Sequence, residues 1–291
     1  MPREQRVTVR TLRRMKERGE KIVMVTAYDY PTALLVDRAG VDVILVGDSL
    51  GMVVLGLPST LQVTLDDMAR HTAAVARAEP GAMIVGDMPF MSYEASVSEA
   101  VRNAGRLLAA GADAVKIEGG AAYSDVIGAM VRAGIPVMAH VGLTPQKHKL
   151  LGGYRLIGKR AEEAREVIED ALGAEEAGAF AVVIEYTAWE VAKKITEKLT
   201  IPTICIGSGP YCDGQVLVIH DLLGLSPTPP PFVKRYHNLA DEIVKAVAAY
   251  AQEVRSGIFP GEEHYWGMKP GEAEKLEEKE ERSPRPAAAR R

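Results

Sequence analysis

Short runs of apolar and β-branched residues recur along the chain, and a stretch with helical periodicity follows most of them. Continuous apolar runs of this length are typical of parallel strands that are buried on both faces. We therefore expect eight buried strands with helices between them. The runs occupy residues 22–28, 41–48, 83–89, 114–120, 135–143, 181–187, 201–209 and 216–225.

The expected helices end in a common way. Ala-Gly pairs stand at residues 39–40, 110–111, 133–134 and 177–178, each just before the next apolar run. Glycine accepts the left-handed conformation that follows the last turn of a helix. The pairs therefore indicate helix ends and support the alternation of helix and strand.

Eight strand–helix units predict an α/β protein with a closed (β/α)8 TIM barrel. An open dinucleotide-binding sheet is disfavoured, because the first run leads into AYDYP and not into G-x-G-x-x-G. Residues 8–18 predict an amphipathic helix with Thr8 as its N-cap, which would close the lower mouth of the barrel.

The expected domain organisation is one barrel domain over residues 1–260 and a charged tail over residues 261–291. A proline-rich connector, residues 226–232, follows the last run, and a closing helix is expected at about residues 237–255. The tail is rich in Glu, Lys and Arg and of low complexity, so we expect it to be disordered.

Composition narrows the class of protein. The chain has 291 residues, 47% of them hydrophobic, which is enough for a large core. A formal net charge of −4 argues against a nucleic-acid partner. The chain has neither an apolar signal core near its start nor a run of roughly 18 apolar residues, so we expect a cytoplasmic protein with no membrane partner. The only cysteines, Cys205 and Cys212, fit a reducing compartment, and we expect both to be plain thiols.

Ionisable residues stand at the ends of five consecutive predicted strands. In a (β/α)8 barrel, the carboxyl ends of the strands form the face that carries the active site. Residues two apart on a strand share a face, so neighbouring apolar residues would point to the helices and the charged ones to the barrel mouth. The residues are Asp48, Asp87, Lys116 with Glu118, His140 and Glu185.

Each of these residues taken alone has a structural explanation. Asp48, Asp87 or Glu185 would serve as a helix cap, Lys116 and Glu118 as an ion pair, and His140 as a core residue with satisfied hydrogen bonds. Taken together they imply more, because each uncompensated buried carboxylate costs several kcal/mol and one lysine cannot neutralise three or more.

A divalent cation would neutralise these carboxylates. Carboxylate oxygens favour a hard ion such as Mg²⁺, and the single histidine argues against zinc. Mg²⁺ takes two oxygens from a 2-oxo acid and acidifies the adjacent C–H bond, and Glu185 would then act as general base. The residues alone therefore predict metal-assisted enolisation of a 2-oxo acid or a related carbon–carbon step.

Several longer stretches resemble the ketopantoate hydroxymethyltransferase family, which forms ketopantoate from 3-methyl-2-oxobutanoate in pantothenate and coenzyme A synthesis. The resemblance runs from about residue 7 to about residue 260, and its motifs are specific. The stretches include VDVILVGDSLGMVVLG, GDMPFMSY, GADAVKIEGG, IPVMAHVGLTPQ and CDGQVLVIHDLLGL.

The resemblance implies a role for each residue at the barrel mouth. Asp48 and Asp87 would bind Mg²⁺ directly, with Glu118 as the third acid of the metal site. Ser49 would hold the substrate carboxylate, Lys116 would contact the substrate, and His140 would lie beside the enolate. Glu185 would be the catalytic base.

The resemblance also implies the partners and the fold type. The one-carbon donor of the family is 5,10-methylenetetrahydrofolate, its barrel is related to the phosphoenolpyruvate mutase and isocitrate lyase group, and its members form homo-oligomers, commonly decamers. Loops 49–65 and 143–159 are candidates for substrate cover and donor binding, and loop 207–214 for a tight turn.

Two other hypotheses remain at this stage. One is a Mg²⁺-dependent oxo-acid mutase or lyase of the related group, which needs no folate. The other is a non-catalytic barrel that serves as an assembly scaffold.

Overall fold

The structure is a computed structural model, which describes residues 6–281 of the chain. Its centre is a closed barrel in which the strands follow one another in the order β1 to β8. All neighbouring strands pair in parallel, including β1 with β8. The predicted (β/α)8 barrel is therefore confirmed. The strands are β1 (Ile22–Thr26), β2 (Val43–Val46), β3 (Met83–Asp87), β4 (Ala114–Glu118), β5 (Val137–Gly142), β6 (Ala181–Glu185), β7 (Thr203–Ile206) and β8 (Gly214–Leu217).

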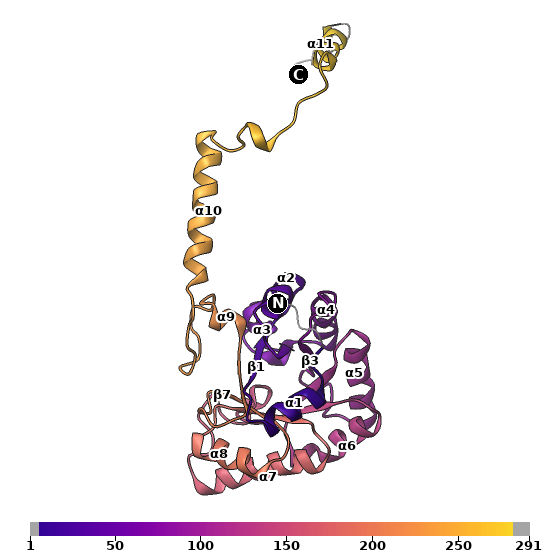
Figure 1. Cartoon of the computed structure of the whole chain (residues 1–291), viewed down its shortest axis with the longest axis vertical. Helices are drawn as coiled ribbons and strands as arrows, with labels where there is room; N and C mark the ends of the chain where they lie inside the picture. The colour runs from indigo at the N-terminus through magenta and orange to yellow at the C-terminus, as the bar shows by residue number, and fades with distance from the viewer. Residues whose placement is uncertain (1–5, 282–291) are drawn as a thin grey trace, which may run out of the picture. The chain divides into compact units, whose positions relative to one another are not determined.

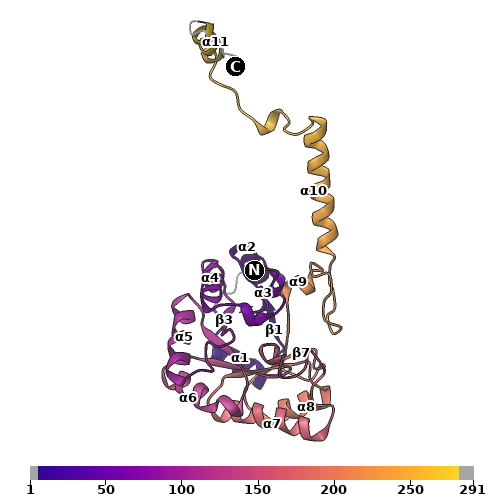
Figure 2. The ribbon, with the colours of Figure 1, turned by 180° about the vertical axis from the view of Figure 1, so that it is seen from behind.

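Helices surround the outside of this sheet (Figures 1 and 2). The predicted Ala-Gly ends are all confirmed, because Ala39, Ala110, Ala133 and Ala177 are C-caps and the glycine after each has a positive φ. The helices of the barrel unit are α1 (Val9–Glu17), α2 (Tyr30–Arg38), α3 (Leu50–Val53), α4 (Leu65–Ala76), α5 (Val97–Ala109), α6 (Ser124–Arg132), α7 (Ala161–Glu176), α8 (Trp189–Lys198) and α9 (Ile219–Leu222), with the 3₁₀ turns η1 (Thr60–Gln62), η2 (Ala121–Tyr123) and η3 (Pro145–Lys147).

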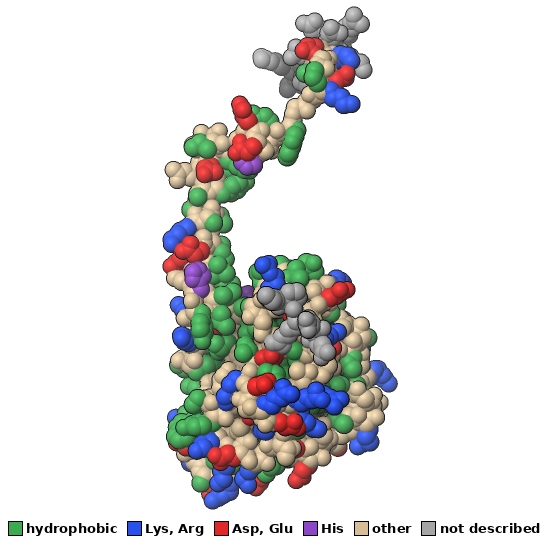
Figure 3. Space-filling view, viewed as in Figure 1, with side chains coloured by type: hydrophobic (Ala, Val, Ile, Leu, Met, Phe, Trp, Pro, Cys, Tyr) green, Lys and Arg blue, Asp and Glu red, His purple; other side chains and the backbone are tan. Residues whose placement is uncertain are grey.

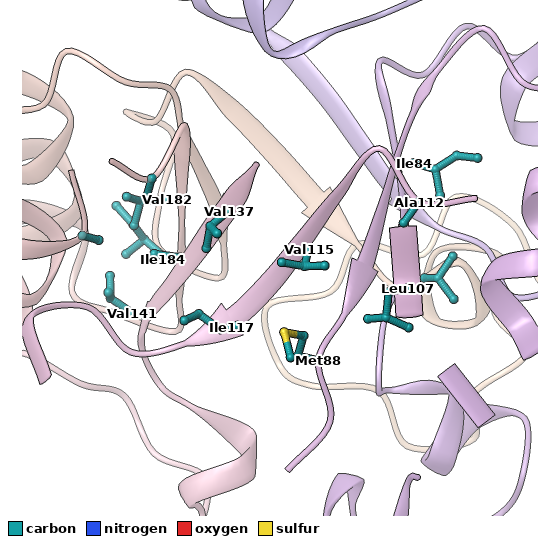
Figure 4. Close-up of a cluster of buried hydrophobic side chains, with 14 of the residues drawn as sticks. Ile84, Met88, Leu107, Ala112, Val115, Ile117, Val137, Val141, Val182 and Ile184 are labelled. Atoms are coloured by element: carbon teal, nitrogen blue, oxygen red, sulfur yellow. The ribbon is translucent and has the colours of Figure 1, made fainter. Parts of the chain in front are cut away.

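Alternate residues of each strand belong to two different cores. The outward side chains, such as Val115 and Ile117 of β4, pack against the helices in a buried cluster (Figure 4). The inward side chains, such as Met83, Val85 and Met138, fill the lower part of the barrel. Full burial of each such side chain contributes about 1.5–3 kcal/mol. The two cores fix the direction in which every strand residue points.

Helix α1 seals the lower end of the inner core. Thr8 is its N-cap, as predicted, and Thr8 and Thr11 bond each other's backbone N–H in a capping box. Leu12 is fully buried in the same cluster as Met24 of β1. The opposite end of the barrel remains open and is the end that can carry polar side chains.

The last strands differ from the prediction in two ways. The connection from β7 to β8 is the loop 207–213 and contains no helix. The run 216–225, which we expected to be a strand, divides into the end of β8 and the short helix α9. An apolar run alone does not distinguish strand from helix, and this explains the error.

The prediction for the cysteines was wrong. Cys205 and Cys212 are joined in a disulfide, with their sulfur atoms 2.01 Å apart and both residues buried. Strand β7 holds Cys205, and the loop turns back so that the Cα atom of Cys212 comes within 5.7 Å of its Cα atom. The bond closes the loop and ties it to β7.

The chain divides into two compact units after His237. The expected boundary between the barrel domain and the tail, residue 260, lies within the second unit. The predicted closing helix exists as α10 (Leu239–Ser256), but it belongs to the second unit and buries none of its residues. The described part of the tail contains η4 (Glu262–His264) and α11 (Glu272–Glu281), where we expected disorder. The rest of the tail, residues 282–291, lies outside the described residues.

None of the helices in residues 6–281 combines the length and the apolar character that a bilayer crossing requires.

Candidate active site

The open end of the barrel carries a layer of ionisable side chains above the inner apolar core. The strand register sets this layer, because Asp87 is paired with Lys116, and Glu118 with His140. Lys116 and Glu118 lie on the same side of β4 as the inward Ala114. Asp87, Lys116, Glu118 and His140 are each less than 5% exposed. The predicted residues of β3, β4 and β5 are therefore brought together.

Asp87 is the centre of the charged layer. Its Oδ1 atom lies 2.9 Å from Nζ of Lys116, and its Oδ2 atom accepts the backbone N–H of Asp48 at 3.1 Å. Burial alone would lower the pKa of Lys116, but Asp87 and then Asp48 raise it above its ordinary value. Lys116 is therefore held as a cation between the acids.

Gln146 was missed by the sequence reasoning and connects the acids. Its side-chain N–H₂ donates to Asp48 Oδ2 at 2.9 Å, and its backbone N–H donates to Glu118 Oε2 at 3.0 Å. The side-chain carbonyl oxygen of Gln146 accepts a hydrogen bond from the hydroxyl of Tyr93 at 2.8 Å. The residue lies in the LTPQ stretch, which we treated as part of a loop, and its depth could be recognised only from η3 turning into the barrel mouth.

His140 stands between Lys116 and Glu185. Its Nδ1 atom is 3.3 Å from Nζ of Lys116, and its Nε2 atom is 3.2 Å from Oε2 of Glu185. Burial, followed by the charge of Lys116, lowers the pKa of His140 well below its ordinary value, so the ring is neutral near pH 7. An ammonium group only donates, so Nδ1 accepts and the ring proton lies on Nε2.

The acids of this layer resist ionisation. Burial, and then the neighbouring Asp87, raise the pKa of Asp48 to about 8. Burial, and then Asp48, raise the pKa of Glu118 well above its ordinary value. Burial also raises the pKa of Glu185 to about 7, although Lys116 opposes this. If all of these acids were ionised, their negative charge would exceed what Lys116 neutralises.

The donor set fits a hard divalent cation, although a finished coordination sphere is not formed. Among residues 6–281, no three acidic, histidine or cysteine side chains already converge as metal ligands. Asp87 Oδ1 is buried and has no aligned hydrogen-bond donor, and the mutual repulsion of Asp48 and Asp87 would fall beside a cation. Asp48, Asp87 and Glu118 supply the oxygen ligands that Mg²⁺ prefers.

A cavity of about 720 Å³ lies above the charged layer. The acids, Lys116 and His140 line its floor, and Ser49, which follows Asp48, lines it as well. The hydroxyl of Tyr28 lies 2.9 Å from Oγ of Ser49 and orients it. The wall opposite comes from Tyr186, Phe232 and the proline-rich connector, which was not predicted to reach the site. A small oxo acid and part of a larger ligand would both find room in this volume.

Loop 207–213 supports the Glu185 end of β6. Oγ of Ser208 donates to the backbone carbonyl of Ile184 at 2.9 Å and accepts the N–H of Thr187 at 3.0 Å. The loop is closed by the disulfide, and a side chain at Gly207 would collide with Phe232. It is therefore a tight structural turn.

The family model and the similar sequences give the same family. The family model described as ketopantoate hydroxymethyltransferase matches residues 6–262. A protein of Hyperthermus butylicus named 3-methyl-2-oxobutanoate hydroxymethyltransferase is 76% identical over 277 residues, which cover 95% of this chain and 96% of that protein. A protein of the same name from Ignicoccus hospitalis is 66% identical over 261 residues, covering 90% and 99%.

Solved structures agree in fold. A phosphonopyruvate hydrolase solved in complex with oxalate and Mg²⁺ has a TM-score of 0.58 at 16% identity, covering 95% of this chain and 99% of that one. A 2,3-dimethylmalate lyase, described as a member of the PEP mutase/isocitrate lyase superfamily, has a TM-score of 0.56 at 19% identity, covering 94% and 99%. At such identities the likeness concerns the fold alone, and it confirms the predicted barrel type.

Proposed function

The chain belongs to the ketopantoate hydroxymethyltransferase family, and we propose that it adds a hydroxymethyl group to 3-methyl-2-oxobutanoate to give ketopantoate for pantothenate synthesis. The observation that carries the proposal is the placement of Lys116, His140 and Glu185 on one cavity floor beside three buried carboxylates. The family match over most of the chain favours this reaction over an oxo-acid mutase or lyase and over a scaffold.

We infer that the one-carbon donor is 5,10-methylenetetrahydrofolate. In the balanced reaction, the C3–H bond of the oxo acid breaks and a C–C bond forms to the methylene carbon. Both bonds from that carbon to N5 and N10 of the folate break, and water supplies the hydroxyl group. The two nitrogens take up the C3 proton and one proton of the water. Holding both substrates in one cavity converts the encounter of two molecules into a reaction between neighbours.

Asp48 and Asp87 would hold the divalent cation, with Glu118 as the third acid, and the carboxylate oxygens favour Mg²⁺. A bound cation of this kind would draw electron density from the keto oxygen and acidify the C3–H bond. The hydrogen bonds from Gln146 fix the direction of Asp48 and Glu118 before the ligands arrive.

Glu185 would remove the proton from C3. A general base works best when its pKa lies near the working pH, and burial brings the pKa of Glu185 to about 7. The Nε2 atom of the neutral His140 lies 3.2 Å from this carboxylate and makes no aligned hydrogen bond within residues 6–281, so its N–H would donate to the enolate that forms beside it.

Lys116 would stabilise negative charge on the substrate oxygen, because Asp87 and Asp48 keep it cationic despite its burial. Ser49 would hold the substrate carboxylate with its backbone N–H, while its hydroxyl group is held by Tyr28.

We also propose that the protein is a homo-oligomer, with a decamer as the expected size, and that it acts in the cytoplasm. Hydrophobic side chains gather along α10 (Figure 3), and Val244, Val247 and Tyr250 are each more than half exposed. Exposed apolar surface of this extent is typical of protein contacts. Light scattering on the full chain gives the subunit number, and cell fractionation gives the location.

The deciding experiment is turnover of 3-methyl-2-oxobutanoate with methylenetetrahydrofolate and Mg²⁺, with the donor or the metal omitted in parallel. We expect ketopantoate only in the complete mixture. A product formed without any donor would contradict the proposed transfer.

A further inference from the structure

The wall of the cavity that follows β8 carries an acid for which the proposed chemistry has no use. Asp221 lies on α9, lines the cavity and is only 7% exposed. Within the described part of the chain, no side chain or backbone N–H donates a hydrogen bond to its carboxylate, and no cation pairs with it. The carboxylate is therefore available to a ligand in the cavity.

Two further polar groups on the same wall also lack partners. His220 and Ser226 line the cavity, but Nδ1 of His220 and Oγ of Ser226 are themselves buried and make no hydrogen bond in residues 6–281. Asp221 and its neighbour Asp29 face His220 as negative charges, but neither binds it directly. The wall therefore offers the carboxylate of Asp221 as its acceptor.

The backbone of this wall is fixed in advance. The N–H of Ile219 donates to Oγ1 of Thr26 at 2.9 Å, and the N–H of Leu225 donates to the carbonyl of His220 at 2.8 Å. These bonds attach α9 to β1 and close the turn that follows it. Asp221 is thus held in place on a rigid element, as specific recognition requires.

The wall is connected to the floor through Tyr28. The ring of Tyr28 lies 5.6 Å from the ring of His220, while its hydroxyl group is bonded to Ser49. The oxo acid requires the floor, where Ser49, Lys116 and the acids lie. The second substrate is then left with the wall formed by α9 and the proline-rich connector.

The chemistry of the wall selects the ligand. A carboxylate accepts two parallel N–H bonds most strongly, and a 2-amino-4-oxopyrimidine edge presents such a pair on its 2-amino group and its ring N3–H. Proline and aromatic side chains, including Tyr186 and Phe232, give the flat apolar surface that a heteroaromatic ring packs against. A second metal site is disfavoured, since among the described residues Asp221 is the only carboxylate of α9 and the connector that lines the cavity.

We propose that Asp221 binds the 2-amino-4-oxopyrimidine edge of the pterin of the one-carbon donor and is a specificity-determining residue. The inference rests on the proposed function, because it assigns the second substrate of the same cavity. Tetrahydrofolate and other reduced pterins share this edge, so the residue recognises the ring and not the side chain that distinguishes them.

The test compares Asp221→Asn with Asp29→Asn. The amide introduced in Asp221→Asn would present an N–H₂ donor where the pterin also donates, and we expect the KM for methylenetetrahydrofolate to rise roughly 10- to 100-fold. Deuterium exchange at C3 of the oxo acid, which needs no donor, should stay within about twofold of the parent rate. Asp29→Asn is the control. Asp29 is exposed and acts electrostatically on His220, so its replacement removes a nearby charge. Asp29 is also the N-cap of α2, and asparagine keeps that cap.

The binding of tetrahydrofolate and of 6-methyltetrahydropterin is measured for the unmodified enzyme and for Asp221→Asn. Both ligands carry the pterin ring, but only the first carries the folate side chain. The affinities for the two ligands should fall by the same factor in Asp221→Asn. An unchanged donor KM, or loss of affinity for tetrahydrofolate alone, would overturn the assignment of Asp221.

A second measurement avoids any effect of the variant on folding. A folate analogue without the 2-amino group should bind the unmodified enzyme at least roughly tenfold more weakly than folate, and equal binding would refute the proposal. Failure of the proposed function has a different signature, because the unmodified enzyme would then show neither C3 exchange nor transfer.

Discussion

Nε2 of His140 lies 3.2 Å from Oε2 of Glu185, while Nδ1 on the other side of the same ring lies 3.3 Å from the ammonium of Lys116. The imidazole thus separates the cation from the proposed base. Because its pKa is lowered, the ring is neutral and shields Glu185 from a full ion pair with Lys116. A direct ion pair would make the carboxylate a weaker base.

Glu185→Gln should abolish exchange of the C3 proton of 3-methyl-2-oxobutanoate and keep binding of Mg²⁺ and the oxo acid. We expect a loss of roughly 100-fold or more, since a positioned general base contributes about that much. Exchange is followed by NMR in deuterated water. Glu190→Gln, an exposed change on α8, is the matched control. Full exchange in the Glu185 variant would remove the residue from the base role.

The pH dependence of exchange tests the same residue without a variant. Burial raises the pKa of Glu185 to about 7, and only the unprotonated carboxylate accepts a proton. The exchange rate should therefore rise with pH up to about 7 and level off above it. Initial rates from about pH 5 to about pH 9 check this. A rate that is already level at about pH 5 would show an ordinary carboxylate.

The barrel was predictable because its signals are local. Each strand is a continuous apolar run, and the side chains that share a face are fixed by the strand period of two, so Lys116 and Glu118 could be placed at the mouth with Asp87 and His140. The Ala-Gly pairs were informative for the same reason, since a helix end depends on a few neighbouring residues.

Other features depend on contacts between distant segments, which one sequence does not reveal. Gln146 reaches Asp48 across almost a hundred residues of chain. Cys212 meets Cys205 only because the β7–β8 loop turns back. Asp221 lies in an apolar run that we expected to be a strand, so its place in the cavity wall could not be predicted. The helix α10 was predicted from its periodicity, but the sequence did not indicate that it belongs to the second compact unit.

Asp48→Ala should weaken Mg²⁺-dependent binding of the oxo acid. Removing a proposed ligand leaves Asp87 and Glu118 to hold the cation, and we expect at least a roughly tenfold loss of affinity. Calorimetry with and without Mg²⁺ measures it, and Asp125→Asn, an exposed change in the first turn of α6, is the control. Unchanged affinity would mean that the metal lies elsewhere.

Replacement of Cys205 and Cys212 by Ser should destabilise the protein. The disulfide closes a short loop, for which the loss of chain entropy in the unfolded state corresponds to about 2 kcal/mol. Denaturant unfolding should show a lower free energy for the double variant, and a reductant should lower that of the parent only. Two titratable thiols in the denatured, unreduced parent would contradict the bond.

Gly120→Ala should destabilise the barrel near Glu118. A Cβ atom at Gly120 would lie 1.9 Å from the backbone carbonyl oxygen of Asp170 on α7, and that backbone cannot move aside because α7 is packed in the helix layer. Asp170 also accepts the N–H of Ala121, so the same contact fixes the turn after β4. We expect a loss of about 1–3 kcal/mol in the free energy of unfolding.

The matched control for this change is Gly105→Ala on α5, where a Cβ atom meets no other atom within 4 Å. Alanine favours a helix interior over glycine by about 0.5–1 kcal/mol, so this variant should be more stable than the parent. Denaturant unfolding measures the change in the free energy of unfolding for both variants. A decrease for Gly120→Ala and an increase for Gly105→Ala would show that the effect at Gly120 arises from its contact with α7. Equal effects would show that the close approach of Gly120 to Asp170 does not constrain the fold.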